Sequence, residues 1–268
     1  MRRFLAVGFV FWCMLLAVPG QAAAQVAVQE GTLQQREARP GETYAGTIVV
    51  TNVSDVPQAV RLYQTDYRFY ADGRAVYGEP GTDPRSNARW ITLNPSSVTV
   101  PPRSQATVQY TVQVPGDSAR RLAGSYWSVI MVEPVEPASA LAAQGAPGLR
   151  IVTRIRYGVQ VVTHIAGTGV ARLDFDNPGV VYGEGGRVLE FDMRNTGDRS
   201  VPLKVRLELF DAAGERVLSR EASVRILHPG TSVRQRFPLG VPSGRTYEAM
   251  VTADTGDNVF GAQYTLRL

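Results

Sequence analysis

The chain has 268 residues, of which 44% are apolar and 19% are charged, a composition typical of globular proteins rather than low-complexity or collagen-like chains. Its formal net charge is +4, and Lys204 is the only lysine among 28 basic residues. This weak positive charge does not favour nucleic acid as a partner. The length is sufficient for two domains, each with its own core.

The first 24 residues have the features of a secretory signal peptide. Arg2 and Arg3 form a basic start, residues 4–18 are almost entirely apolar, and residues 22–24 are small. The apolar run is shorter than the ~20 residues that a membrane helix needs. We therefore expect cleavage after Ala24 and a bacterial protein in the periplasm or secreted. The mature chain then has no cysteine, and it has no second apolar run of membrane length.

The remaining sequence alternates between apolar and polar residues in short segments, which predicts β-strands. Residues 47–51 are β-branched, residues 107–114 alternate almost without fault, and residues 126–132 are apolar on both faces. A long strand is expected over residues 151–165. The alanine-rich segment 138–148 is bracketed by prolines and is expected to form a loop.

A weak internal repeat accompanies these strands. Residues 47–62 resemble residues 189–207, because in each segment a strand ends at asparagine, turns through aspartate and returns as a strand ending in Val-Arg-Leu. Later features recur in the same order, which indicates two copies of one module. The sequence therefore predicts an all-β fold with two tandem immunoglobulin-like β-sandwich domains, spanning residues 25–165 and 166–268.

One segment carries a resemblance to a known family. Residues 126–137, a loop and then residues 149–156 resemble the corresponding part of the PapD-like periplasmic pilus assembly chaperones. In that family the last strand of the first domain lends alternate apolar residues to a pilin subunit. A basic residue near its end binds the subunit's C-terminal carboxylate in the cleft between the domains. The resemblance implies five partner-binding residues: Arg156, its partner Arg36 on the first strand, and the apolar donors Leu149, Ile151 and Ile155.

The same strand can be interpreted from its residues alone. Alternation places Ile155, Val159 and Val161 on one face and Arg154 and Arg156 on the other. An exposed edge strand is a template for pairing with a partner strand, and a guanidinium group can bind a carboxylate through two hydrogen bonds. A strand with one face in the core and its arginines in solvent would give the same pattern, so both interpretations stand at this point.

A second resemblance leads to an alternative function. Residues 72–77, 89–91 and 98–102 are similar to segments of the peptidoglycan-binding region of WxL-interacting surface proteins. This resemblance implies a cell-envelope structural or adhesion protein that binds peptidoglycan or a surface protein.

No motif predicts catalysis or a bound metal. Residues 254–256 match the Asp-Thr-Gly triplet of aspartic proteases, but they lie in a sequence typical of a hairpin turn. His164 and His228 are the only histidines, and the mature chain has no cysteine to complete a zinc site. We therefore expect a non-enzymatic binding protein without a cofactor, whose partner is a secreted or pilin-like subunit, with peptidoglycan as the alternative.

Overall fold

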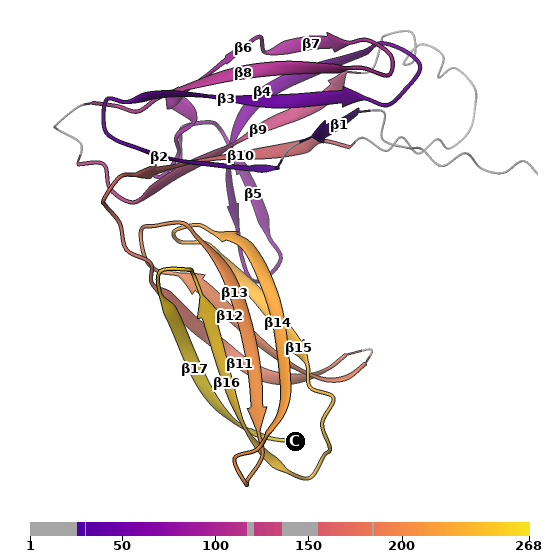
Figure 1. Cartoon of the computed structure of the whole chain (residues 1–268), viewed down its shortest axis with the longest axis vertical. Coiled ribbons are helices and arrows are strands. Elements are labelled where there is room, and N and C mark those ends of the chain that lie inside the picture. Colours follow the sequence, from indigo (N-terminus) through magenta and orange to yellow (C-terminus); the bar gives the residue numbers. More distant parts are fainter. Residues whose placement is uncertain (1–25, 30, 117–120, 136–154, 184) are drawn as a thin grey trace, which may run out of the picture.

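A computed structural model describes residues 26–29, 31–116, 121–135, 155–183 and 185–268. Apart from one 3₁₀ turn at Ala88–Trp90, the regular structure of these residues is entirely β. They form two β-sandwiches, one after the other along the chain (Figure 1). The predicted all-β fold with two tandem immunoglobulin-like sandwiches is therefore confirmed. None of the described segments forms a helix long and apolar enough to cross a membrane.

The N-terminal sandwich consists of two facing sheets. The first has the strand order β1-β3-β8-β6, with β1 (Val26–Gln29), β3 (Thr43–Asn52), β8 (Gln105–Gln113) and β6 (Ile91–Asn94). The second has the order β2-β10-β9-β4-β5. Its strands are β2 (Leu33–Ala38), β10 (Tyr157–Ile165), β9 (Ser125–Val135), β4 (Gln58–Phe69) and β5 (Ala75–Gly78). A short strand, β7 (Ser97–Val100), also pairs with β4. Alternate apolar residues from both sheets meet in one core, including Ile48, Leu62 and Ile130.

The C-terminal sandwich repeats this layered plan. One sheet has the order β11-β12-β15, with β11 (Leu173–Gly183), β12 (Gly186–Asn195) and β15 (Ser232–Pro238). The other has the order β14-β13-β16-β17, with β14 (Arg216–Leu227), β13 (Val201–Phe210), β16 (Thr246–Asp254) and β17 (Val259–Arg267). Phe191, Leu207 and Val251 are among the fully buried residues between the two sheets.

The repeated asparagines of the sequence have the same structural role in both sandwiches. Asn52 ends β3, and its Nδ2 donates to the carbonyl oxygens of Val56, Val100 and Pro101. Asn195 ends β12, and its Nδ2 donates to the carbonyl oxygens of Arg199 and Leu227. Each side-chain oxygen accepts the amide hydrogen of the second following residue. The shared strand–turn–strand sequence therefore corresponds to a shared turn, held by one buried amide.

The hairpin of β4 and β5 reaches from the first sandwich toward the second (Figure 1). β4 pairs with β9 as far as Thr65 and with β5 from Asp66 to Phe69. At the end of β4, Phe69 packs against the core of the second sandwich, and in the turn that joins β4 to β5 the Ala71 amide donates to Ser232 Oγ at 2.9 Å. The two sandwiches therefore share packed surface in addition to the linker between them.

Candidate partner-binding site

The strand predicted to bind a partner is β10, and two thirds of its outer edge is covered. β10 pairs with β9 along its length, and residues 160–165 also pair in parallel with β2. The expected exposed edge is therefore wrong for residues 160–165, because a strand from the start of the chain occupies it. Within the described part of the chain, residues 157–159 pair with β9 alone. The chain just before β2 stays close to this edge, because the carbonyl oxygen of Thr32 accepts the amide hydrogen of Gln160 at 2.8 Å.

The two faces of β10 are both largely buried. Val159, Val161 and Ile165 lie in the core of the N-terminal sandwich, as the alternation predicts. On the opposite face, Val162 is fully buried in a small cluster with Trp127 of β9 and Ile226 of β14, in the second sandwich. This face is therefore not in solvent near the end of β10, because the C-terminal sandwich packs against it.

Arg156 directly precedes the open part of β10 and is half exposed. Its Nε lies 3.0 Å from Glu133 Oε1, while Arg61 Nη2 lies 2.8 Å from Glu133 Oε2. The hydrogen bond from Arg61, followed by the charge of Arg156, holds the pKa of Glu133 below its ordinary value despite partial desolvation. Two guanidinium groups thus share a single carboxylate, which leaves one positive charge unmatched in this cluster.

Arg36 does not lie beside Arg156. It is exposed on β2 and pairs in register with Thr163, seven residues along β10 from Arg156. At about 3.3 Å per residue this corresponds to roughly 23 Å along the strand. Arg36 borders a small pocket with Tyr44 and Tyr110, on the side of β2 facing the first sheet. The structure therefore does not bring the two arginines together as a carboxylate-binding pair.

The remaining predicted residues are divided between described and undescribed parts of the chain. Ile155 is 40% exposed next to Arg156. Leu149, Ile151, the predicted loop 138–148 and the predicted signal peptide 1–24 all lie outside the described residues.

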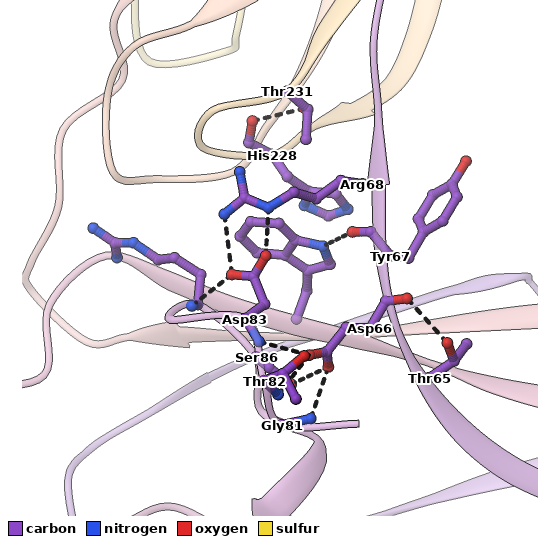
Figure 2. Close-up of polar contacts among 12 residues, drawn as sticks. Thr65, Asp66, Tyr67, Arg68, Gly81, Thr82, Asp83, Ser86, His228 and Thr231 are labelled. Carbon is purple, nitrogen blue, oxygen red and sulfur yellow. Dashed lines mark hydrogen bonds and ion pairs between the residues drawn. The ribbon is translucent and has the colours of Figure 1, made fainter. Parts of the chain in front are cut away.

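The junction between the sandwiches is built around an aromatic stack. The rings of Trp127 and His228 lie 4.4 Å apart between centroids and are tilted by only 6°. Trp127 Nε1 donates to the carbonyl oxygen of Tyr67 at 2.8 Å. Arg68 lies over the Trp127 ring and is held by two hydrogen bonds to Asp83 (Figure 2). Because these residues come from β4, the loop after β5, β9 and the second sandwich, the stack joins the two halves of the molecule.

The loop that carries Asp83 is held by another carboxylate. Asp66 of β4 is almost fully buried and accepts hydrogen bonds from the amides of Gly81, Thr82 and Asp83 at 2.7–3.0 Å (Figure 2). The hydroxyl of Ser86 donates to the same carboxylate. With its oxygens satisfied by the loop, Asp66 positions Asp83 opposite Arg68 and is unavailable as a general base.

Both histidines are buried at this junction and are electrically neutral. His228 Nε2 lies 2.9 Å from Gln160 Oε1 and its Nδ1 2.9 Å from Ser200 Oγ. His164 has the same arrangement, with Gln35 Oε1 at 3.1 Å and Ser125 Oγ at 2.7 Å. Because a glutamine Oε1 can only accept, each Nε2 carries the hydrogen and each Nδ1 accepts from serine.

The electrostatics of the junction keep these rings uncharged. Burial lowers the pKa of His228 to about 3, and burial together with the charge of Arg199 lowers the pKa of His164 to about 4. The neutral rings therefore serve as packing and hydrogen-bonding groups at ordinary pH. No local pattern in the sequence shows that two histidines 64 residues apart lie at one interface.

A cleft of about 570 Å³ opens beside the junction and the linker 166–171. Its charged lining residues are Arg199, Glu37 and Asp257. Arg199 Nη2 lies 3.3 Å from Glu37 Oε1, and its Nη1 donates to the carbonyl oxygen of Thr168 at 3.0 Å. The one arginine lining this cleft is therefore already paired, and a second acidic group lies near it, so the cleft does not favour a carboxylate ligand.

No group of three or more His, Cys, Asp or Glu side chains that could hold a metal ion occurs in the described ranges. Ser125 and Ser200 do contact histidines, but both serines are buried within the junction. The arrangement accounts for packing between the sandwiches rather than for a nucleophile facing a substrate.

No protein-family model and no curated protein matches the chain. Among solved structures, a chain of the CsuC–CsuE chaperone–tip adhesion subunit complex from Acinetobacter baumannii matches 90% of this chain and 98% of its own length, at 12% identity and a TM-score of 0.47. The class 5 fimbriae chaperone CfaA matches 91% and 99%, at 10% identity and a TM-score of 0.46. The Pseudomonas aeruginosa CupB2 chaperone matches 90% and 100%, at 14% identity and a TM-score of 0.41.

Each of these structures is named as a chaperone or a chaperone complex, and the sequence also resembles chaperones. Because each TM-score is below 0.5, the similarities do not assign a partner or an activity to this chain.

Proposed function

We propose that the protein is an exported, non-enzymatic binding protein that acts as an assembly chaperone. It captures an extended segment of a secreted, pilin-like subunit on the open edge of β10 at residues 157–159. Arg156 binds a carboxylate of that segment, and Ile155 contributes apolar contact at the same edge.

The observation that carries this proposal is the partial coverage of β10. β2 covers residues 160–165, while among the described strands only β9 pairs with residues 157–159, which supports strand addition at this place. Main-chain hydrogen bonds to an added strand would supply affinity without requiring a particular sequence. Because β2 covers the rest of this edge of β10, a captured segment would pair only at residues 157–159.

The charge beside this edge supports binding of a carboxylate. Arg156 and Arg61 share Glu133, so the cluster has an excess of one positive charge directly next to Tyr157. A half-exposed guanidinium can exchange one carboxylate contact for another at little cost, because such surface pairs contribute only about 0–1 kcal/mol.

The experiment is a pull-down of the tagged mature protein from an extract of its own cell envelope, followed by mass spectrometry. We expect one small secreted subunit with the wild type and its loss with Arg156→Ala. Arg236→Ala is the matched control, because Arg236 is also an exposed arginine paired with a glutamate, but it lies on the second sandwich. Amide hydrogen exchange at residues 157–159 should slow in the purified complex.

Two results would contradict the proposal. If the wild type and Arg156→Ala capture the same proteins, Arg156 does not bind the partner. Recovery of wall polymer alone, equally with all three forms, would instead support the adhesion alternative derived from the sequence.

A further inference from the structure

The last strand, β17 (yellow in Figure 1), forms one edge of the C-terminal sandwich. It pairs with β16 along all nine of its residues without a register shift, and among the described strands it pairs with no other. Arg267 is its only charged residue, and it contains no proline. A long, regular and nearly uncharged edge strand is a template for pairing with another strand, because one side of its backbone has free hydrogen-bonding groups.

The other edge strands of this sandwich each carry a feature that hinders strand addition. β14 has Arg220 and Glu221 in its middle and two register shifts against β13. β15 carries Arg234 and ends at Pro238, and β11 has Pro178 at a bulge. Charges, prolines and bulges are the features that protect edges from pairing between molecules. Among the described edges of this sandwich, β17 alone lacks such protection.

The hydrogen bonds at both ends of β17 show which of its backbone groups face outward. Leu268 exchanges two hydrogen bonds with Arg245, and the Thr255 amide donates to the carbonyl oxygen of Asn258 at 2.9 Å. Hydrogen-bonded pairs alternate along an antiparallel ladder, so the even-numbered residues from 258 to 268 turn their N–H and C=O groups toward β16. The odd-numbered residues from 259 to 267 therefore turn theirs toward the unpaired side.

We propose that β17 pairs antiparallel with β17 of a second copy of this chain, about a two-fold axis that passes through Gln263. In this register odd-numbered residues lie opposite odd-numbered residues, so the outward N–H and C=O groups of the two copies meet one another. The interface is isologous, because the same strand edge is used by both copies. It joins two four-stranded sheets into one continuous sheet.

The side chains of β17 are complementary to themselves in this register. Phe260 and Tyr264 pack against the core of the C-terminal sandwich. Phe260 lies opposite Leu266 of the partner subunit, and Tyr264 lies opposite Ala262 of the partner subunit, so apolar residues face apolar or aromatic ones. Arg267 lies opposite Val259 of the partner subunit, so no charge faces a like charge. This self-complementarity favours a second copy over an unrelated strand.

The position of β17 in the molecule leaves room for such a dimer. Asp257 and Asn258, directly before β17, line the cleft beside the junction. From there β17 runs away from the N-terminal sandwich (Figure 1). Antiparallel pairing therefore places the two N-terminal sandwiches at opposite ends of the dimer. Because the contact uses only the C-terminal sandwich, the inference stands independently of the proposed function.

The test measures self-association of the full mature protein by sedimentation velocity over a range of concentrations. We expect a concentration-dependent dimer in the wild type. Gln263→Lys and Gln263→Glu each place two like charges opposite one another at the two-fold axis and should weaken the dimer about tenfold. An equimolar mixture of the two variants should restore it, because Lys then lies opposite Glu. Thermal unfolding checks that both variants remain folded.

The matched control lies on the opposite edge of the same sheet. Ser219 of β14 is also an exposed uncharged residue, and Ser219→Lys and Ser219→Glu should leave the dimer unchanged. A second measurement tests the register. Gln263→Cys should form a disulfide-linked dimer on mild oxidation, because the two Cα atoms lie about 5.5 Å apart in this register. Ser219→Cys should remain largely unlinked.

Three results would overturn the inference. The first is a wild type that stays monomeric at every concentration up to the millimolar range. The second is a dimer that neither Gln263→Lys nor Gln263→Glu weakens, since the copies then meet at another surface. The third is equal disulfide formation by Gln263→Cys and Ser219→Cys. Restoration of the dimer in the Lys–Glu mixture, together with selective linkage at position 263, would confirm the antiparallel pairing of β17.

Discussion

Trp127 and His228 lie face to face across the junction, with ring centroids 4.4 Å apart, although one belongs to the N-terminal sandwich and the other to the C-terminal sandwich. Both side chains are almost completely buried. This contact packs the outer face of β9 against the turn between β14 and β15. At the same junction Val162, near the end of β10, is buried against Ile226 of the second sandwich.

Removing the stack should destabilise the protein strongly. Trp127→Ala is expected to lower the free energy of unfolding by about 3–5 kcal/mol, because it deletes a large buried side chain and leaves a cavity. Trp127→Phe keeps a ring but loses the hydrogen bond to Tyr67, and should cost less. Urea denaturation measures both. Tyr182→Ala, where the side chain is 86% exposed, should change stability by less than about 0.5 kcal/mol. An equally small effect of Trp127→Ala would refute the importance of the stack.

The buried histidines should make stability fall on mild acidification. The pKa of His164 is lowered to about 4, against an ordinary value of 6.5. A lowered histidine pKa means that the unfolded state binds the proton first, so stability is complete above about pH 6.5 and decreases as pH falls toward 4. For one such group, the free energy of unfolding changes by up to about 1.4 kcal/mol per pH unit.

His164→Gln tests this dependence. The variant should be less stable at pH 7 but should lose less stability than the wild type between pH 6 and 4.5, as measured by denaturation at each pH. Since His228, with a pKa lowered to about 3, remains in the variant, part of the slope should persist. Identical slopes for both proteins would show that His164 does not titrate with folding.

The two equivalent asparagines should have equivalent energetic roles. Asn52→Ala and Asn195→Ala each leave buried carbonyl oxygens without their donor and should each cost about 1–3 kcal/mol. Asn258→Ala is the control, because that side chain is exposed in a turn. Thermal unfolding of the three variants would decide the matter, and a neutral result at either buried position would argue against the shared turn.

Gly124 tests how closely the two sandwiches approach. It has φ +73°, and an added Cβ would lie 2.0 Å from the carbonyl oxygen of Asp198. Gly214 has φ +78° in an open turn, with nothing within 4 Å of an added Cβ. Gly214→Ala should therefore lower the free energy of unfolding by only about 1–2 kcal/mol, the cost of placing a Cβ in the left-handed backbone region. Gly124→Ala should cost clearly more, because backbone of the second sandwich must also move.

The comparison of the two glycine variants isolates the steric part of the effect. Equal losses of unfolding free energy in calorimetry would mean that the junction accommodates the extra methyl group. A larger loss at Gly124 would confirm the tight approach.

Much of the fold could be predicted from local pattern. Alternation over residues 107–114 corresponds to β8, and the repeated asparagine turns correspond to Asn52 and Asn195. These features are readable because strand periodicity and turn chemistry depend on neighbours in the chain. The core face of β10, with Val159 and Val161, was predictable for the same reason.

The candidate site was predictable only in part. Arg156 could be singled out, but its sharing of Glu133 with Arg61 depends on the pairing of β4, β9 and β10. The predicted pairing of Arg156 with Arg36 failed, because β2 joins β10 in a register that places Arg36 opposite Thr163. Register between strands more than a hundred residues apart has no local signal.

The sequence by itself determined the strands, the repeated turns and the apolar faces that form two cores, because each follows from the order of neighbouring residues. Only the tertiary structure decided which edge of β10 is covered, that His164 and His228 are buried, and that Arg156 borders a tyrosine-lined pocket. These properties depend on contacts between strands, and between sandwiches, that are far apart in the chain, so the order of neighbouring residues does not encode them.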